Sequence, residues 1–331
     1  MIVLSLFDGI GTGLLALKNA GINVSKYYAC EIDRKAMQVA KNNFPEIIEL
    51  GDVEKINISE LGKIDLLIGG SPCQGFSRNG KHLNFEDKRS RLFFKFVEVL
   101  QEVRKNNPQV KFMLENVRMK KEWQNVITDY LQVSPIIIDS RIHTPQARER
   151  IYWTNIEGVT QPLKTASTIR EIAETRDTRN YIVQNGVKFD PAISEKERAL
   201  VSCVDGEIRI RQATKAGYIV AEDGDGINLQ FPTSKTRRGR VIKGKMPTLD
   251  CACNVCYLLD GAIHKITVRE AERLQNLPTG YTEGLTDAEA REKIGNGWQE
   301  KTVRHIFFLL RQSSNLIRAE QSAPTQRKGK T

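Results

Sequence analysis

Hydrophobic and polar positions follow two different rhythms along the first half of the chain. Apolar runs of strand length, such as IVLSL at residues 2–6, alternate with stretches in which apolar residues recur every three to four positions. The strand-like runs are 2–9, 24–33, 64–70, 110–117 and 135–142. The helical stretches between them are 11–21, 34–44, 89–106 and 122–132. This alternation predicts an α/β fold with a doubly wound, mostly parallel sheet and helices on both faces.

The pattern changes after Trp153. Residues 156–262 hold many short β-like runs separated by Gly and Asp turns, which predicts a smaller, β-rich second domain. Helical spacing returns in three later stretches, and we expect the apolar stripe of the last one, 301–312, to pack on the first domain. We predict a first domain of residues 1–156 plus 263–320, a second domain of residues 157–262 and a disordered basic tail of residues 321–331.

Composition and charge narrow the kinds of partner. The chain has 331 residues, of which 40% are hydrophobic and 27% are charged, as is usual for a soluble globular protein. Met1 leads directly into apolar residues without a basic leader, no apolar run is long enough to cross a bilayer, and six cysteines are too few for a dense disulfide framework. We therefore expect a cytoplasmic protein. The net charge of +10 and the isoelectric point of about 9.3 indicate a polyanionic partner, with nucleic acid as the first candidate.

Ionisable and nucleophilic side chains stand at or just after the predicted strands. They are Asp8, Glu31, Asp52, Cys73 and Glu115. Ligands of open α/β sheets bind at the carboxyl ends of the strands. We therefore expect these five side chains on one rim of the sheet, around one ligand site.

The turn FDGIGTG joins the first strand to the first helix. Gly9 and Gly11 allow close approach of a ligand near the helix N-terminus, and Glu31, about 20 residues on, suits the two hydroxyls of a ribose. Asp8 within the turn would repel a pyrophosphate, and the glycine spacing differs from the dinucleotide fingerprint. S-adenosylmethionine carries a ribose and an adenine but no phosphate, so it fits this turn better than a dinucleotide.

Cys73 lies in the segment GGSPCQGFSRNG, directly after the apolar run 64–70. The cysteine alone is compatible with a buried packing residue, a metal ligand, half of a disulfide or a nucleophile. Glu115, Arg148 and Arg150 follow later strands, where we expect them on the same rim. A thiol that adds to an electron-poor ring, an acid that protonates a ring nitrogen and a guanidinium that holds a carbonyl oxygen together favour the nucleophile.

Eight segments carry a resemblance to a known family. They are FDGIG, GD at 51–52, SPCQGFS, FEDKRSRLFF, ENV, QARERIYW, REAERLQNLP and IGNG. In this order and spacing they are similar to the motifs of the DNA (cytosine-5) methyltransferases of the bacterial and phage modification type, and they cover residues 1–156 and 263–312. The segments SLFDGIGTGLLALK and WQEKTVRHIF also resemble the eukaryotic de novo branch. The resemblance implies a Rossmann-like sheet that binds S-adenosylmethionine, a target-recognition domain at 157–262, and methyl transfer to cytosine C5 in duplex DNA.

The resemblance also implies roles for individual residues. Cys73 would attack cytosine C6, Glu115 would hold N3 and the exocyclic amine, Arg150 would contact O2, and Arg148 would support the site. The S-adenosylmethionine site would be lined by Phe7, Asp8, Gly9, Gly11, Glu31, Ile32, Asp52, Val53, Pro72, Leu92, Asn296 and Trp298. Contacts to DNA would come from Gln74, Ser77, Arg78, Arg237, Arg238, Arg240, Thr248 and Leu249. Because the target atom is inaccessible inside a duplex, the base would be flipped out, and residues 74–88 would form a mobile loop that closes over it.

Three features stay open at the level of sequence. Trp298 would either cover the cofactor or pack under the last helix. The arginines within residues 237–240 would either read guanines or hold phosphates. The cysteines of CACNVC, residues 251–256, would need Cys203 or His264 to complete a metal site, and because their spacing is not a paired CxxC we predict no metal.

The substrate has alternatives as well. The same chemistry on transfer RNA is the main one, and the separate basic middle region with the pair Thr248 and Leu249 favours DNA. A non-catalytic DNA-binding relative would lack the thiol or the carboxyl of ENV, and a nicotinamide oxidoreductase would carry a dinucleotide fingerprint. We expect a monomer that binds double-stranded DNA and has no membrane or obligate protein partner, with a cognate restriction endonuclease as an optional companion.

Overall fold

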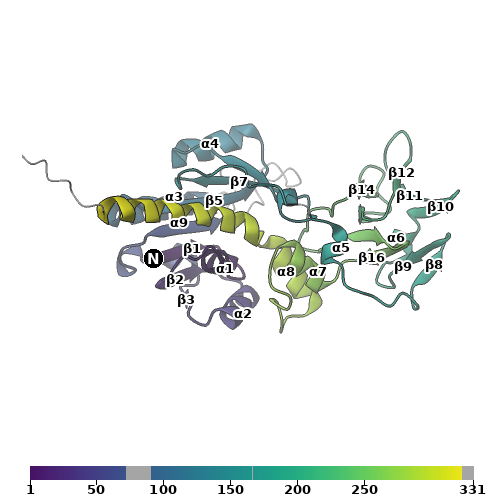
Figure 1. Ribbon diagram of the computed structural model, residues 1–331, viewed down its shortest axis with the longest axis horizontal. Helices are drawn as coiled ribbons and strands as arrows, with labels where there is room; N and C mark the ends of the chain where they lie inside the picture. Colours follow the sequence, from purple (N-terminus) through teal and green to yellow (C-terminus); the bar gives the residue numbers. More distant parts are fainter. Residues whose placement is uncertain (72–90, 166, 323–331) are drawn as a thin grey trace, which may run out of the picture.

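The computed structural model describes residues 1–71, 91–165 and 167–322. Figure 1 shows an elongated molecule, with a large sheet and its helices at one end and small β-sheets at the other. We call these parts the large lobe (strands β1 to β7 with helices α1 to α4 and α9) and the β-rich lobe (strands β8 to β16). Helices α7 (Val268–Leu274) and α8 (Asp287–Asn296) lie between them.

Seven strands of the large lobe form one sheet in the order β3-β2-β1-β4-β5-β7-β6. The strands are β1 (Ile2–Leu6), β2 (Lys26–Cys30), β3 (Ile48–Glu49), β4 (Leu66–Gly70), β5 (Lys111–Val117), β6 (Ile136–Asp139) and β7 (Glu149–Thr154). β1 pairs parallel with β2 and β4, and β4 pairs parallel with β5, whereas β7 runs antiparallel between β5 and β6. The predicted α/β fold with a mostly parallel sheet is confirmed.

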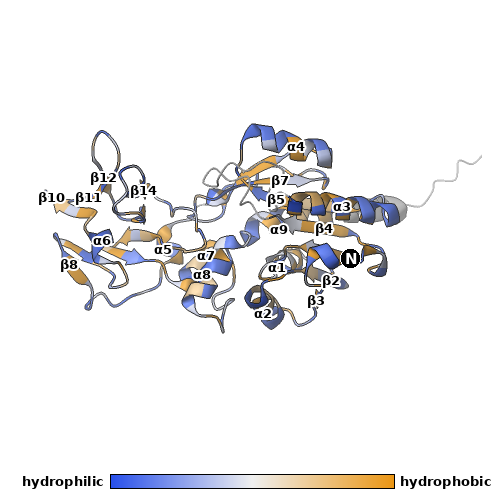
Figure 2. Cartoon of the chain, turned by 180° about the vertical axis from the view of Figure 1, so that it is seen from behind, coloured by the Kyte–Doolittle hydropathy of each residue, from blue (hydrophilic) through white to orange (hydrophobic). Residues whose placement is uncertain are grey.

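Helices cover both faces of this sheet because successive side chains of a strand point in opposite directions. Val3 and Ile68 pack in one core with α1 (Thr12–Asn19), α2 (Arg34–Asn43) and α9 (Glu300–Ser322). Leu4 and Leu67 pack in a second core with α3 (Arg91–Asn106) and α4 (Lys121–Leu131). In Figure 2 the central strands are mainly apolar, whereas the covering helices carry polar and apolar residues side by side.

The C-terminal helix α9 packs on the large lobe, as its apolar stripe predicted. Its buried residues between Val303 and Leu310 belong to the same core as α1. Within the described part of the chain no helix is long and apolar enough to cross a membrane. The tail predicted to be disordered starts at Gln321, and residues 323–331 lie outside the described residues.

Two details of the strands differ from what the pattern of apolar and polar positions predicted. The pattern did not single out β7, whose residues 151–153 are all buried because the strand lies between two others with both faces covered. Strand β6 ends at Asp139 rather than at residue 142. The carboxylate of Asp139 caps the turn that follows, because Oδ1 accepts a hydrogen bond of 3.0 Å from the N–H of Arg141.

The β-rich lobe contains two sheets, with strand orders β14-β13-β15-β16-β9-β8 and β10-β11-β12. The strands are β8 (Ile182–Gln184), β9 (Val187–Phe189), β10 (Val201–Val204), β11 (Glu207–Arg211), β12 (Tyr218–Ala221), β13 (Gly226–Asn228), β14 (Arg240–Ile242), β15 (Cys256–Leu259) and β16 (Ala262–Lys265). The short helices α5 (Ile169–Ile172) and α6 (Glu195–Arg198) complete the lobe. Phe189, Ile210, Ile227 and Leu258 form its separate core, as a β-rich second unit requires.

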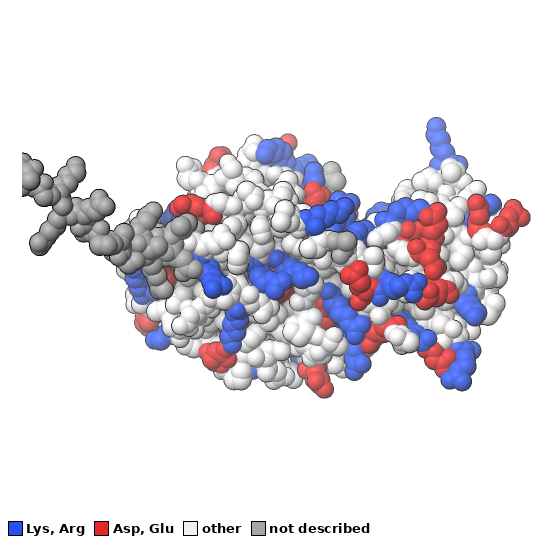
Figure 3. Space-filling view, viewed as in Figure 1, with Lys and Arg blue, Asp and Glu red and all other residues white. Residues whose placement is uncertain are grey.

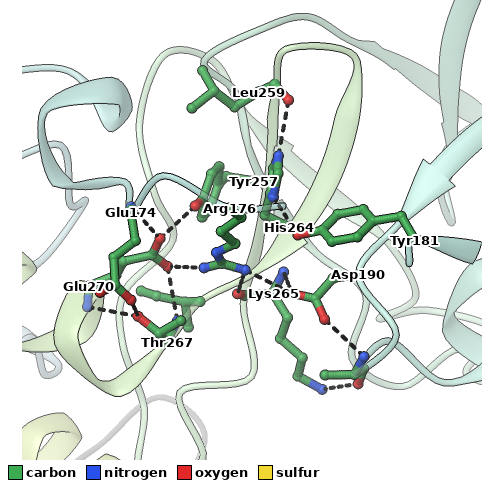
Figure 4. Close-up of polar contacts among 12 residues, drawn as sticks. Glu174, Arg176, Tyr181, Asp190, Tyr257, Leu259, His264, Lys265, Thr267 and Glu270 are labelled. Atoms are coloured by element: carbon green, nitrogen blue, oxygen red, sulfur yellow. Dashed lines mark hydrogen bonds and ion pairs between the residues drawn. The ribbon is translucent and has the colours of Figure 1, made fainter. Parts of the chain in front are cut away.

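A buried polar network joins the β-rich lobe to helix α7 (Figure 4). Arg176 pairs with Asp190 at 2.7 Å and with Glu270 at 2.5 Å, and the side chain of Glu270 is 0% exposed. Glu270 also accepts hydrogen bonds from the Tyr257 hydroxyl at 2.7 Å and from the N–H of Thr267 at 2.9 Å. Because Thr267 and Glu270 form the capping box of α7, this network fixes the start of that helix to the β-rich lobe.

Candidate active site

The carboxyl ends of β1, β2, β4 and β5 surround one cavity of about 500 Å³, a volume typical of small-molecule sites. The predicted site residues that line this cavity are Phe7, Asp8, Gly9, Glu31, Ile32, Asp52, Val53, Leu92, Glu115, Arg148, Arg150, Asn296 and Trp298. The structure therefore brings ten of the twelve predicted cofactor residues together with three of the four predicted catalytic residues. These side chains come from both ends of the sequence, so the cavity depends on the return of α8 and α9 to the sheet.

Part of the predicted site lies outside the described residues. This applies to Pro72, Cys73, Gln74, Ser77 and Arg78, and to the rest of the predicted loop 74–88. Ser71 and Leu92, on either side of this segment, both line the cavity. Described residues on both sides of the segment that contains the cysteine therefore line the cavity.

Glu31 is held in place by backbone groups at the cavity wall. Its Oε2 accepts a hydrogen bond of 2.9 Å from the N–H of Gly9, and its Oε1 accepts two from the N–H groups of the next two residues. Gly9 has a φ of +63°, in the left-handed region that favours glycine. Gly11 does not line the cavity, and a Cβ there would lie 3.3 Å from the Cβ of Ala40, where α1 approaches α2.

Asp8 is a buried acid on the same wall. It is 8% exposed, its Oδ1 accepts a hydrogen bond of 2.5 Å from the Tyr27 hydroxyl, and its Oδ2 has no hydrogen-bond partner among the described residues. Burial raises the pKa of Asp8 to about 6, with a smaller contribution from the negative charge of Glu31. The buried Thr12 Oγ1 on this wall is likewise unpartnered within the described part of the chain. Unpartnered buried oxygens fit a ligand with donor groups, such as an ammonium ion.

Glu115 has each of its carboxylate oxygens bound by a different donor. Arg150 Nε lies 3.1 Å from Oε1, and the indole Nε1 of Trp298 donates to Oε2 at 3.1 Å. The side chain of Glu115 is only 11% exposed. Arg150 stands on β7, next to β5, so the two strands place this pair side by side. The carboxylate therefore has a fixed orientation on the cavity wall.

Arg148 is a brace between distant segments. Its guanidinium donates to the carbonyl oxygens of Leu249 at 3.0 Å, Gly295 at 3.0 Å and Gly297 at 2.8 Å. The residue is 3% exposed, and burial lowers the pKa of Arg148 to about 9. Arg148 thus holds the loop that carries Trp298, and its predicted support of the catalytic site stays a prediction.

Sequence reasoning missed a cation at the cavity. Lys293 of α8 lines the cavity and forms an ion pair of 2.5 Å with Asp33, the N-cap residue of α2. The two residues are 260 positions apart, so no local pattern pairs them. The only sequence signal is the position of Lys293 two residues before the segment GN at 295–296.

The residues predicted to contact DNA from the second domain lie in or beside the β-rich lobe. Arg237 is exposed and stacks on the ring of Phe231 at 4.3 Å, and Arg240 is exposed on β14. Arg238 is partly buried and donates to the carbonyl of Ser234. Thr248 is exposed, and its hydroxyl donates to the carbonyl of Ala147. Leu249 is only 1% exposed, so its side chain packs in the core rather than lying on the surface.

The cysteines of CACNVC differ in exposure and in hydrogen-bond partners. Cys251 is exposed and donates to Asn296, whereas Cys253 is buried and donates to two backbone carbonyls. Burial raises the pKa of Cys253 and of Cys256 to about 12. In residues 1–71, 91–165 and 167–322 there is no group of three or more His, Cys, Asp or Glu side chains that could hold a metal ion.

The fold resembles solved methyltransferase structures. A protein described as a DNA modification methyltransferase encoded within an Escherichia coli prophage superposes with a TM-score of 0.63 at 20% identity, over 95% of this chain and 99% of that one. The Schizosaccharomyces pombe Dnmt2 methyltransferase gives a TM-score of 0.61 at 18% identity, also over 95% of this chain and 99% of that one. At these identities the likeness concerns the fold alone.

Sequence comparison identifies relatives among bacterial and phage enzymes. The chain is 39% identical over 167 residues to the orphan methyltransferase M.SPRI of Bacillus phage SPR, a match that covers 46% of this chain and only 37% of that protein. It is 28% identical over 318 residues to the type II methyltransferase M.HpaII of Haemophilus parainfluenzae, which covers 88% of this chain and 84% of that one. The family model described as C-5 cytosine-specific DNA methylase matches residues 1–308. The chain therefore belongs to the C-5 cytosine-specific DNA methylase family, as the sequence motifs predicted.

Proposed function

We propose that this chain transfers a methyl group from S-adenosylmethionine to C5 of a flipped-out cytosine in duplex DNA, at a specific short sequence. The observation that carries the proposal is the position of Glu115. Its fixed carboxylate lies on the wall of the same cavity that Asp8 and Glu31 line. A base held by Glu115 would therefore meet the cofactor within one cavity.

The cavity suits S-adenosylmethionine, which supplies an electrophilic methyl group when bound. Glu31 would accept hydrogen bonds from the ribose hydroxyls, and Ile32 and Val53 would flank the adenine. The unpartnered Oδ2 of Asp8 would accept a hydrogen bond from the ammonium of the methionine part. These three roles use side chains that already line one cavity, and they need no rearrangement of the sheet.

Cytosine C5 is a weak nucleophile until a group adds across the C5–C6 bond. In the proposed reaction the Cys73 thiolate adds to C6, while Glu115 binds the protonated N3 and the exocyclic amine and Arg150 binds O2. C5 then carries the electron density and takes the methyl group. Loss of the C5 proton to a base restores the C5–C6 double bond and releases the thiolate, and N3 returns to Glu115 the proton that it took up when the thiolate added. The base passes its proton to water, so the enzyme returns to its starting state.

Charge supports a DNA substrate. The chain has a net charge of +10, and Figure 3 shows Lys and Arg side chains on both sides of the hollow between the large lobe and the β-rich lobe. Arg237, Arg238 and Arg240 of the β-rich lobe would contact phosphates or guanines, and Thr248 would contact the backbone. Because the cavity lies at the carboxyl ends of the strands of the large lobe, the target base would have to leave the duplex to reach it.

Methyl incorporation tests the proposal. Purified protein with radiolabelled S-adenosylmethionine should label duplex DNA and leave transfer RNA unlabelled, and bisulfite sequencing of plasmid DNA from expressing cells should give the recognition sequence. Cys73→Ser should abolish transfer with the fold and cofactor binding intact, and Glu115→Gln should reduce the rate severely. Labelling of transfer RNA alone would instead support the alternative substrate, which the family description as a DNA methylase disfavours.

We also propose that the protein acts as a monomer in the cytoplasm, because one chain carries every part of the proposed site. Light scattering in the presence of duplex DNA should give one protein chain per DNA duplex. Two chains per duplex would overturn the monomer. A cognate restriction endonuclease would be tested by adding unmethylated DNA to extracts of expressing cells and looking for cleavage at the sequence that this protein methylates.

A further inference from the structure

The residue Trp298 connects two parts of the site that sequence reasoning treated separately. It stands between α8 and α9, lines the cavity, and also packs against the core that α9 joins. These two positions bear on the two alternatives predicted for Trp298, a cover over the cofactor and packing under the last helix. Its most specific contact is neither of them, because the indole Nε1 donates a hydrogen bond of 3.1 Å to Glu115 Oε2.

Two glycines leave the space that the indole occupies. A Cβ at Gly70 would lie 2.7 Å from Trp298 Nε1 and 3.1 Å from Glu115 Oε2. A Cβ at Gly13 would lie 3.4 Å from Trp298 Cζ3, and closer still to Tyr27 and Ile68. Glycine at residue 70 thus gives the indole nitrogen and the carboxylate an unobstructed contact.

The loop that carries Trp298 is fixed on both sides. Before it, the carbonyl oxygens of Gly295 and Gly297 accept hydrogen bonds from the buried guanidinium of Arg148. After it, the N–H of Glu300 donates to the carbonyl of Gln275 at 2.9 Å. The indole is therefore presented to Glu115 by an anchored backbone, which favours a lasting contact over an incidental one.

We propose that Trp298 is a positioning residue, which holds the Glu115 carboxylate in the orientation that a flipped cytosine requires. This inference rests on the proposed function. Each oxygen of a carboxylate has two acceptor sites. Arg150 forms an ion pair with Oε1 and Trp298 donates a hydrogen bond to Oε2, so among the described residues each oxygen keeps at least one acceptor site for a ligand. Those sites match the protonated N3 and the exocyclic amine of cytosine, which donate in parallel.

Steady-state kinetics on duplex DNA provides the first test. Trp298→Phe keeps an aromatic ring in the cavity but removes the N–H donor. Since a hydrogen bond to a charged group is involved, kcat for methyl transfer should fall about 10- to 100-fold, while KM for S-adenosylmethionine stays near the wild-type value. Trp153→Phe is the matched control, because its indole donates to Thr128 outside the cavity. It should leave kcat and both KM values near wild type.

A second variant and a spectroscopic measurement test the same contact without relying on the kinetics of Trp298→Phe alone. Gly70→Ala should lower kcat in the same way, because the added methyl group separates the indole from the carboxylate. Ultraviolet resonance Raman difference spectra, wild type minus Trp298→Phe, should report a strongly hydrogen-bonded indole N–H, and the Glu115→Ala protein should lose this signal.

The outcomes separate this inference from the proposed function. A raised KM for S-adenosylmethionine with unchanged kcat in Trp298→Phe would overturn the positioning role and leave Trp298 as a wall of the cofactor site. An indole signal that persists in Glu115→Ala would overturn the contact itself. Absence of cytosine methylation by the wild-type protein would instead refute the proposed function, whatever the Raman result.

Discussion

The buried carboxyl of Asp8 allows a prediction in which stability and cofactor binding change in opposite directions. The substitution Asp8→Asn keeps a carbonyl oxygen that can accept the hydrogen bond of the Tyr27 hydroxyl, and it removes the negative charge. In the native protein that charge is buried, and its Oδ2 is unpartnered within the described residues. The substitution should therefore stabilise the protein without cofactor and weaken its binding of S-adenosylmethionine.

The magnitude follows from the pKa of Asp8, which burial raises from its ordinary value of 3.8 to about 6. One pKa unit corresponds to about 1.4 kcal/mol, so ionised Asp8 lowers the free energy of unfolding by about 3 kcal/mol above pH 6. Because the folded state holds the proton more tightly than the unfolded state, this loss of stability develops as the pH rises from about 4 to about 6. Below that window both states are protonated and the loss disappears.

Urea unfolding at several pH values measures this effect. At pH 8 the Asp8→Asn protein should exceed wild type in free energy of unfolding by up to about 3 kcal/mol, and the difference should shrink as the pH falls below 6. Asp225→Asn is the matched control, because this buried carboxylate has an ion pair with Lys243 and accepts hydrogen bonds from two N–H groups. It should be destabilised instead, by about 1–3 kcal/mol.

Calorimetric titration measures the other half of the prediction. Loss of the charged acceptor for the ammonium should weaken S-adenosylmethionine binding about 10- to 100-fold, and wild-type affinity should itself decline as the pH falls through 6 and Asp8 is protonated. A stability difference that is absent at pH 8, or that does not vary with pH, would refute the burial argument. Unchanged affinity in Asp8→Asn would refute the role of Asp8 in holding the ammonium.

Three further changes test other parts of the molecule. Arg176→Met leaves Glu270 buried without its cation, so the free energy of unfolding in urea should fall by about 3–5 kcal/mol. The control Arg170→Met breaks only an exposed ion pair and should leave the free energy of unfolding nearly unchanged. Equal effects of the two substitutions would contradict the argument that burial makes the Arg176 pair important. Arg148→Met removes the donor to three backbone carbonyls and should lower both the thermal unfolding temperature and methyl transfer, so an unchanged unfolding temperature would remove its bracing role. If Arg237 contacts phosphate, Arg237→Ala should weaken binding to all duplex sequences about equally and reduce the salt dependence of the binding constant by about one counterion. An effect confined to the target sequence would instead assign Arg237 to base recognition.

Much of the fold and of the site was predictable because the relevant signals are local. The alternation of apolar runs with helical spacing follows from the two periods of backbone structure, so it identified the large sheet and its helices. Glu31 and Glu115 were predictable for a related reason. Each stands at the end of a strand, and the carboxyl ends of parallel strands meet at one rim.

Other features could not be predicted because they join residues that are far apart in the sequence. Trp298 donates to a residue 183 positions away, and Lys293 pairs with one 260 positions away. Neither contact has a local signature, since each depends on the path by which α8 and α9 return to the sheet. The close approach of Ala40 to Gly11 has the same origin, because it depends on how α1 packs against α2.

The sequence by itself determined the kind of fold, the family and half of the residues around the cavity, because apolar periodicity and short motifs are properties of the chain before it folds. Only the tertiary structure decided how those residues act on one another. Burial of Asp8 changes its proton affinity, the brace of Arg148 fixes a distant loop, and the indole of Trp298 reaches Glu115. The physical reason is that desolvation and hydrogen bonding depend on distances in space, which the order of residues along the chain does not specify.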